Sequence, residues 1–264
     1  MNKSNDVSSG VSLTMHEAVA VVRIDNPPLN LLTQDVRRAL GDFFSDIAAD
    51  GTARAVLLAP GEQHFCAGAD MSEFPLRFDP EVARRHGENG HRMCLSLVRC
   101  ALPVVAAIEG ACMGGGLELA LGCDFRVAAG SARLGLPEIR RGVWPGTGGM
   151  PLLARLVGDQ RAKALVIGGD ILDARDAREL GLVDRLAETG NAEDVALVWA
   201  RELAGKPARP LQAAKRLLDH AFVARLEAHL ENELEAYVAC YQTEDAREGN
   251  RAFFDKREPV WTHG

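Results

Sequence analysis

The stretch VVAAIEGACMGGGLELALGCDFRVA, residues 104–128, is the part of the sequence around which the rest is organised. An apolar run of strand length, 104–108, is followed by a glycine-rich turn at 114–116. Glycines at such a turn let backbone N–H groups approach a ligand without an intervening side chain. A helix that begins there directs unpaired N–H groups and a partial positive charge toward the ligand. We therefore expect this turn to stabilise an anion.

Glu118 lies in the first turn of the helix that is expected to begin near Gly115. One explanation is a favourable acidic residue at a helix N-terminus, worth ~0.3–1 kcal/mol. Its neighbours at 117 and 119–121 are all Leu or Ala, however, so the helix is predicted to be buried. A buried carboxylate costs free energy unless it serves a purpose. Glu118 is therefore a candidate catalytic residue.

Glu138 is the second candidate carboxylate, because it follows Pro137 and precedes a second glycine cluster at 146–149. Taken alone, it could equally be a solvated loop charge paired with Arg140 or Arg141. Beside two glycine clusters it suggests acid–base chemistry, because two glutamates can share a water molecule and divide the roles of base and acid.

Composition and charge limit the class of protein. The 264 residues, 47% hydrophobic and 25% charged, fit one large soluble domain or a core with a small appended one. A formal net charge of −7 disfavours a general affinity for nucleic acid or anionic membranes. No apolar run approaches the roughly 20 residues that span a bilayer. Residues 1–10 carry no apolar signal core and are expected to be a disordered lead.

The six cysteines form no CxxC pair, and most lie inside apolar runs. This pattern favours reduced, buried thiols in a cytosol-like compartment over a disulfide framework. We therefore expect a cytoplasmic protein. The cysteines are Cys66, Cys94, Cys100, Cys112, Cys123 and Cys240.

Alternating strand and helix patterns predict an α/β core to about residue 190, followed by a helical tail. Residues 77–87 are expected to be mobile and polar. Thr33 is the expected N-cap of a first helix and Asp79 of a second that runs to Arg99. Expected strands are 11–13, 18–24, 53–59, 104–108, 124–129 and 181–184; later helices are 151–157, 161–167, 173–180, 191–204, 210–220 and 226–246, the last with Leu226, Leu230, Leu234, Tyr237 and Tyr241 on one face.

Other motifs are absent. The glycine clusters match neither a phosphate-binding GxxxxGK[ST] loop nor GxGxxG after a strand, and no GxSxG elbow occurs. His64, His86 and His91 lack the spacing of metal ligands, so no metal is expected and these histidines are predicted to lie at the surface or in loops.

The sequence from about Val11 to Lys256 resembles the crotonase superfamily, the enoyl-CoA hydratase/isomerase family. The most specific segments are HFCAGAD at 64–70, residues 108–128, and LPEIRRGVWPGTGG at 136–149. The resemblance implies an α/β spiral of ββα units with a helical C-terminal region. Residues 11–195 would form the spiral core, and residues 196–264 would help to build a homotrimer or a dimer of trimers.

The resemblance also implies an acyl-CoA thioester substrate and no separate cofactor, because coenzyme A is part of the substrate. Both of the family's hydratase glutamates are present, which implies syn addition of water to a trans-2-enoyl-CoA. The implied site residues are Glu118 and Glu138 as catalytic residues, the N–H groups of Ala69 and Gly115 as the oxyanion hole, Gly146 for positioning water, and Ala67, Gly68, Asp70, Trp144 and Lys256 for binding substrate.

Two departures from the family pattern bear on the substrate. Gln63, Met71 and Ser72 stand where the family often has lysines that meet the CoA phosphates; Lys256 or Arg257 of an adjacent subunit could replace them. Trp144 replaces a smaller aliphatic residue and either narrows the acyl pocket or fills the core. Other CoA-thioester chemistries on this scaffold stay open, namely dehydration of a hydroxyacyl-CoA such as carnitinyl-CoA, a hydratase-lyase, or an isomerase. The acidic charge disfavours a non-catalytic, RNA-binding member.

Overall fold

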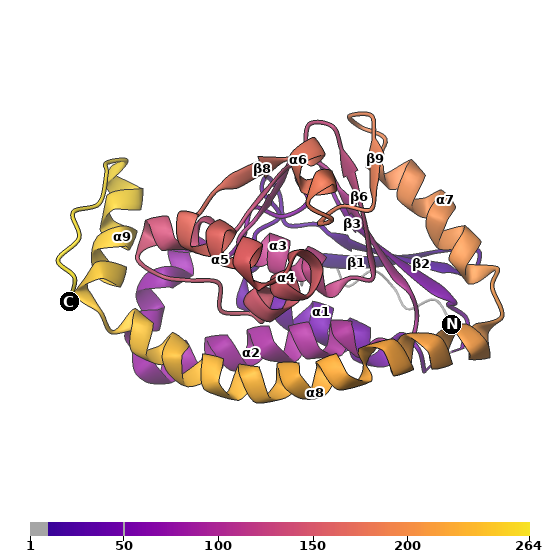
Figure 1. The fold of residues 1–264 in the computed structure, drawn as a ribbon, viewed down its shortest axis with the longest axis horizontal. Helices are drawn as coiled ribbons and strands as arrows, with labels where there is room; N and C mark the ends of the chain where they lie inside the picture. The colour runs from indigo at the N-terminus through magenta and orange to yellow at the C-terminus, as the bar shows by residue number, and fades with distance from the viewer. Residues whose placement is uncertain (1–9, 50) are drawn as a thin grey trace.

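The computed structural model describes residues 10–49 and 51–264. Its main sheet has six strands in the order β1-β2-β3-β4-β6-β9, and a smaller sheet has the order β5-β7-β8 (Figure 1). In the main sheet β1 and β2 pair antiparallel, while every later pairing is parallel. The strands are β1 Val11–His16, β2 Val19–Ile24, β3 Ala55–Pro60, β4 Val104–Ile108, β5 Ala111–Met113, β6 Phe125–Ala129, β7 Arg133–Gly135, β8 Ile171–Asp173 and β9 Arg185–Ala187.

Helix starts follow the expected capping chemistry. Thr33 accepts a hydrogen bond from the N–H of Val36, and Asp79 accepts from those of Glu81 and Val82. Both predicted N-caps are confirmed. The helices are α1 Gln34–Asp46, α2 Pro80–Val98, α3 Gly115–Gly122, α4 Gly149–Val157, α5 Asp159–Gly168, α6 Ala174–Glu179, α7 Ala192–Ala204, α8 Ala208–Tyr241 and α9 Glu244–Asp255, with 3₁₀ helices η2 Met71–Phe78 and η3 Pro137–Arg141.

The order of the elements makes a spiral. The chain passes from β4 in the main sheet to β5 in the small sheet and then into α3, and repeats the step with β6, β7 and η3. Because β4 pairs with β6 and β5 with β7, successive turns stack on one another. The predicted spiral of ββα units is confirmed.

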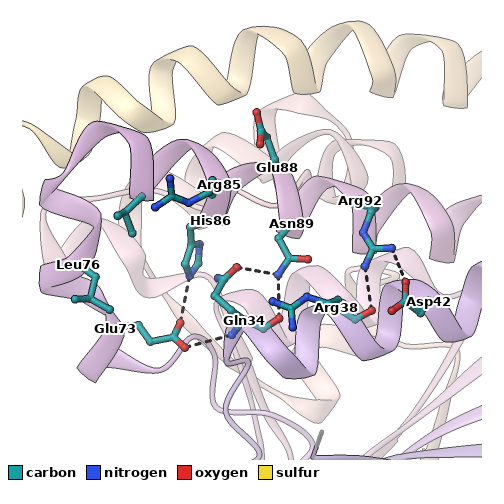
Figure 2. Close-up of a pocket in the computed structure, with 11 residues that line it drawn as sticks. Gln34, Arg38, Asp42, Glu73, Leu76, Arg85, His86, Glu88, Asn89 and Arg92 are labelled. Carbon is teal, nitrogen blue, oxygen red and sulfur yellow. Dashed lines mark hydrogen bonds and ion pairs between the residues drawn. The ribbon is translucent and has the colours of Figure 1, made fainter.

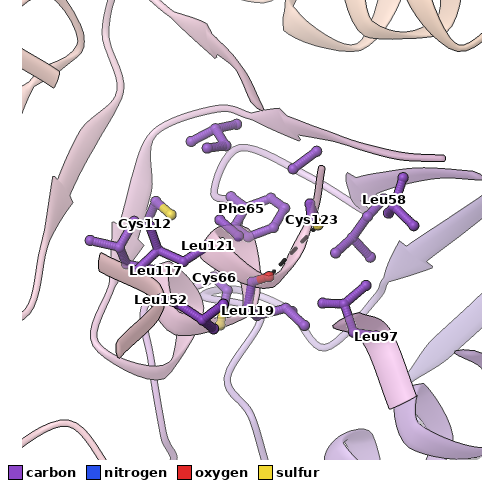
Figure 3. Close-up of a cluster of buried hydrophobic side chains, with 14 of the residues drawn as sticks. Leu58, Phe65, Cys66, Leu97, Cys112, Leu117, Leu119, Leu121, Cys123 and Leu152 are labelled. Atoms are coloured by element: carbon purple, nitrogen blue, oxygen red, sulfur yellow. Dashed lines mark hydrogen bonds between the residues drawn. The ribbon is translucent and has the colours of Figure 1, made fainter. Parts of the chain in front are cut away.

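The parallel strands are buried on both faces, as the continuous apolar runs predict. Val104, Ala106 and Ile108 of β4 join the larger hydrophobic cluster, while Val105 and Ala107 face the cluster beneath α7. Figure 3 shows the part of the larger cluster in which Leu117, Leu119 and Leu121 of α3 lie among Phe65, Cys66 and residues of neighbouring elements. Helix α3 is therefore held from all sides, which fixes the glycine turn that precedes it.

The C-terminal region differs from the prediction in its helix boundaries. Residues 210–220 and 226–246 were expected as two helices, but α8 is continuous over 34 residues and runs beside α2 (Figure 1). The intervening residues 221–225 contain neither Gly nor Pro, and Phe222 is buried against the core. A second helix, α9, begins only after the N-cap Thr243.

Two further local predictions are wrong. Residues 77–87 are not mobile and polar, because η2 precedes Asp79 and the side chains of Arg77 and His86 are buried. Residues 181–184 form a turn instead of a strand, since Gly181 has φ +83° and pairing with β6 starts at Arg185.

The thiol prediction is confirmed: all six cysteines are free, and only Cys240 is not fully buried. Nearly all of the expected lead, residues 1–9, lies outside the described residues. Within the residues that are described, no helix is long and apolar enough to cross a membrane.

The packing of α3 generates a first prediction. A Cβ on Gly116 would meet the carbonyl oxygen of Cys66, a backbone atom that cannot give way. We expect Gly116→Ala to lower the free energy of unfolding by about 1–3 kcal/mol, measured by urea denaturation at fixed protein concentration. Gly205→Ala is the matched control, because its Cβ would meet only ordinary contacts at 3.6 Å. Equal unfolding transitions for the two variants would contradict the close packing of α3.

Candidate active site

Two backbone N–H groups lie side by side at the start of α3. A Cβ on Gly115 would lie 3.9 Å from the Ala69 nitrogen, and one on Gly68 would lie 3.9 Å from the Gly115 nitrogen. Leu32 forms a β-bridge with Ala69, in which the Leu32 N–H donates to the Gly68 carbonyl at 2.9 Å. In the described part of the chain, neither the Ala69 nor the Gly115 N–H donates to a protein acceptor. Both are therefore available to an oxygen that carries negative charge.

Gly68 and Gly114 allow the backbone segments that carry the Ala69 and Gly115 N–H groups to lie close together. Gly68 has φ +105°, and a Cβ there would lie 3.1 Å from the carbonyl oxygen of Met113. Gly114 has φ +53°, and its Cβ would lie 2.7 Å from a carboxylate oxygen of Glu138. A side chain at Gly68 would crowd the Met113 carbonyl, and one at Gly114 would displace the Glu138 carboxylate.

Glu118 is buried, with 4% of its surface exposed. Its Oε1 accepts hydrogen bonds from the N–H groups of Thr147 at 2.8 Å and Gly149 at 3.0 Å. Burial, and next the charge of Glu233, raise the pKa of Glu118, while the two N–H donors and Arg37 act in the opposite direction. The sequence prediction that Glu118 is a buried carboxylate is confirmed.

Glu138 lies on η3 and extends toward Gly114. Its Oε2 is buried and has no hydrogen-bond partner among the described residues. Burial, followed by the charge of Glu118, raises its pKa. The alternative of a solvated charge paired with an arginine is wrong, because Arg140 pairs with Asp170 and Arg141 lies over the ring of Phe253.

A third buried carboxylate, Glu233 of α8, was not predicted. It accepts hydrogen bonds from the N–H of Gly148 at 2.9 Å and contacts His91 and His229 at 3.0 Å each. These contacts lower the pKa of Glu233 against the effect of its burial. Glu233 lies at helical spacing from Leu230 and Tyr237, and this spacing could have identified it as buried. Leu234, which was expected on that buried face, is only half-buried.

Two of the histidine predictions are wrong. His86 and His91 are buried rather than at the surface, with 6% and 7% of their surfaces exposed. Both are on α2, where neighbouring elements cover them: His91 meets Glu233, and Nδ1 of His86 meets the hydroxyl of Tyr237 at 3.1 Å.

Arg37 of α1 was also missed. It is 3% exposed, and its Nη1 donates to the Thr147 hydroxyl at 3.2 Å. Its spacing from Leu40 and Phe44 places it on the apolar face of the helix, which is the signal that could have identified it. Arg37 therefore belongs to the interior of the site rather than to the surface.

The remaining predicted residues take different positions. Ala67 donates its N–H to the Leu29 carbonyl, and Asp70 caps η2 through the N–H of Ser72. Trp144 lies edge-on to the ring of Tyr237, against which Gly146 also packs. These residues lie on the segments that carry Ala69 and Thr147, so the structure brings them near the site.

Lys256 lies at the C-terminal end of α9 with an exposed side chain. Helix α9 packs against η3, where a Cβ on Gly249 would meet the carbonyl group of Arg141. Arg257 is paired with Glu248. A role for Lys256 in binding substrate at an adjacent subunit stays a prediction.

Two free peptide donors beside two carboxylates of raised pKa can perform acid–base chemistry next to a developing oxyanion. On an α/β spiral, this arrangement defines an enzyme of the crotonase type. The sequence model described as enoyl-CoA hydratase/isomerase matches residues 14–264. The chain therefore belongs to the enoyl-CoA hydratase/isomerase family.

Several known proteins are similar over nearly the full chain. A probable enoyl-CoA hydratase of Bacillus subtilis is 34% identical, with 95% of this chain and 98% of that protein covered. A short-chain-enoyl-CoA hydratase of Clostridium acetobutylicum is 33% identical, with 95% and 96% covered. The crystal structure of a carnitinyl-CoA hydratase from Mycobacterium avium matches with a TM-score of 0.86 at 30% identity, covering 97% of this chain and 99% of that one.

The raised pKa of Glu138 predicts a pH-dependent stability. Because this pKa lies above the unfolded value of 4.5, folding favours the protonated carboxyl. Its contribution to stability is present below the unfolded pKa and is lost as pH rises through the folded pKa. We expect Glu138→Gln to be more stable than the wild type by about 1–3 kcal/mol at pH 9, with a smaller gap at pH 5.

Urea denaturation at both pH values and one protein concentration measures this difference. Glu231→Gln, at an exposed position of α8, is the control and should change stability by less than about 0.5 kcal/mol. A Glu138→Gln variant less stable than the wild type at pH 9 would contradict the raised pKa.

Proposed function

We propose that this protein is an enoyl-CoA hydratase that adds water syn across the 2,3 double bond of a trans-2-enoyl-CoA. The observation that carries the proposal is the placement of two carboxylates, the buried Glu118 and the half-buried Glu138 with its buried Oε2, beside the free N–H groups of Ala69 and Gly115. The names of the similar proteins from Bacillus subtilis and Clostridium acetobutylicum support it.

The thioester carbonyl oxygen accepts hydrogen bonds from Ala69 and Gly115. When water attacks Cβ, negative charge moves onto this oxygen in an enolate-like transition state. Peptide donors that are already oriented stabilise that charge without reorganising, and one such donor is worth about 3–4 kcal/mol in enzymes where it has been removed. The partial positive charge at the start of α3 acts in the same direction.

The surroundings of the two glutamates support different roles. Glu118 accepts two N–H bonds and faces Arg37, so its ionised form is better stabilised than that of Glu138. Glu138 has an oxygen without a hydrogen-bond partner, and the negative charge of Glu118 acts on it. Both conditions favour the protonated form of Glu138. Glu118 therefore deprotonates the water that attacks Cβ, while Glu138 orients this water and delivers a proton to Cα.

The other site residues complete the proposal. The Gly146 N–H helps to position the water, while Ala67, Gly68 and Asp70 border the thioester. Trp144 limits the acyl pocket, which favours a short or unusual acyl group.

We further propose that the C-terminal helices build a homotrimer or a dimer of trimers in the cytoplasm. Leu217 and Leu218 of α8 are 73% and 77% exposed, and Phe254 of α9 is 54% exposed. Apolar side chains this exposed support contact with another subunit.

The mechanism predicts the effect of removing each carboxylate. We expect Glu118→Gln and Glu138→Gln each to lower kcat for crotonyl-CoA hydration by ~10²–10⁴-fold, because each removes a proton-transfer group but retains the shape of the side chain. The loss of the conjugated enoyl-thioester absorbance measures turnover, and calorimetry with butyryl-CoA measures binding, which should survive. Turnover near the wild-type level in either variant contradicts the role given to that residue.

Glu233 predicts a shift in the pH profile. Its charge raises the pKa of Glu118, whereas Arg37 lowers it. In Glu233→Gln the amide oxygen can still accept the Gly148 N–H, but the charge is lost. We expect the acid limb of kcat/KM to move down by about half to one pH unit, because Glu118 then ionises at lower pH.

The exposed Glu235, two residues along α8 and paired with Arg84, provides the control variant Glu235→Gln, whose profile should match the wild type. A Glu233→Gln variant that loses activity with no movement of the acid limb would reduce Glu233 to a purely structural role.

A further inference from the structure

Buried polar atoms without hydrogen-bond partners gather beside the proposed site. In this region such atoms are found on Gln34, Arg37, Glu73, Arg77 and His86; elsewhere in the described residues they occur on Glu138 and Asn250. Figure 2 shows Gln34 of α1, Glu73 of η2 and His86 of α2 converging on one space. These three residues line a pocket of about 700 Å³ between these elements, and the buried Arg37 and Arg77 lie outside its lining. In these five residues the unpartnered donors, on Gln34, Arg37 and Arg77, outnumber the one unpartnered carboxylate oxygen, Oε2 of Glu73, so this region is short of hydrogen-bond acceptors.

The guanidinium of Arg37 lies next to Gly115, which carries one of the two oxyanion donors. Its Nη2 is 3.3 Å from the position of a Cβ on Gly115, and its Nη1 is 3.2 Å from that of a Cβ on Gly90. Its Nε has no partner, and among the described residues its side chain donates to the Thr147 hydroxyl and forms no ion pair. Glycine at 90 and 115 means that no side chain from these two positions shields this charge from the site.

Arg77 places a second guanidinium in the same interior. It is 2% exposed, and its Nη1 donates to the Tyr241 hydroxyl at 2.9 Å. Its Nε and Nη2 are unpartnered, and Nη2 lies 4.0 Å from the carboxylate of Glu73, beyond hydrogen-bond distance. Burial and the charges of Arg77 and Arg37 lower the pKa of His86, which keeps this ring neutral.

No carboxylate of the described residues lies within ion-pair distance of Arg37; the charge of Glu118 acts on Arg37 from farther away, and the carboxylate of Glu73 lies 4.0 Å from Arg77. Glu73 is the nearby carboxylate, and its Oε2 is itself unpartnered, 3.6 Å from His86. A buried cation without hydrogen-bonded counter-charge is costly, so it persists where a ligand supplies the missing acceptor. The guanidinium fork matches a planar carboxylate, to which it can donate two parallel hydrogen bonds.

We propose that the acyl group of the substrate carries a carboxylate, which Arg37 binds and the charge of Arg77 attracts. This inference rests on the proposed hydration of an enoyl-CoA and specifies its substrate as the thioester of a short unsaturated dicarboxylic acid. The thioester oxygen at Gly115 places the acyl chain next to Arg37. The same two positive charges repel a trimethylammonium group, which disfavours carnitinyl-CoA as a substrate.

Kinetics with two thioesters test the inference. Trans-glutaconyl-CoA carries a terminal carboxylate, and crotonyl-CoA is its neutral counterpart. We expect the wild type to prefer glutaconyl-CoA by at least ~10-fold in kcat/KM, and Arg37→Met to lower this preference ~10–100-fold, the usual worth of a charge-assisted hydrogen bond. Arg77→Met should lower it less, and Arg37→Lys should retain part of it. Arg84→Met, at a half-exposed arginine paired with Glu235, is the control and should leave the preference unchanged.

Competitive binding separates this inference from the proposed function and needs no turnover. Saturated glutaryl-CoA should bind more tightly than butyryl-CoA, and the difference should disappear in Arg37→Met. This result without hydration of either enoyl thioester would retain the carboxylate subsite and overturn the hydratase. Equal binding of the two saturated thioesters, or an equal loss for both enoyl substrates in Arg37→Met and Arg37→Lys, would overturn the subsite and make Arg37 a residue that positions Thr147.

Discussion

Consecutive N–H groups of one tight loop are divided between two buried carboxylates. Thr147 and Gly149 donate to Glu118, and Gly148, between them, donates to Glu233. The alternation is possible because Gly148 adopts a left-handed conformation, which turns its N–H away from those of its neighbours. One loop thereby ties α3 to α8. The orientation of Glu118 relative to the start of its own helix depends on this connection.

The site concentrates charged groups in the protein interior, where water solvates them least. Their polar atoms fall into two groups, those with hydrogen-bond partners in the protein and those without. Glu118 and Glu233 each accept hydrogen bonds from the backbone, and these bonds offset part of the cost of burial. Oε2 of Glu138 and Nε of Arg37 have no such partner among the described residues. The first group of atoms holds the site in shape. The second group of atoms is free to form hydrogen bonds with water or substrate, and such bonds can contribute to binding or catalysis.

Much of this arrangement was predictable from local sequence because its signals are local. The strands are continuous apolar runs, and the two glycine clusters that frame the site lie at the starts of α3 and α4. Glu118 was identifiable because every neighbour in its helix is apolar. Arg37, Glu233 and His91 were not predicted, because each is a single polar residue on an otherwise apolar helix face. Their partners, Thr147 and Gly148, lie 110 and 85 residues away from Arg37 and Glu233, a separation that no local pattern reveals.

The same distances explain why the C-terminal helix belongs to the chemistry of the spiral core. Glu233 of α8 holds the loop that orients Glu118, Tyr237 packs against Gly146, and Tyr241 holds Arg77. An error in the length or register of α8 would rotate all three side chains away together, since they lie on one helical face. Because α8 is one continuous helix of 34 residues packed along α2, it holds these three side chains in a fixed relation to one another. The active site is therefore complete only with α8 in place, because the loop that orients Glu118 and the buried Arg77 both depend on side chains of this helix.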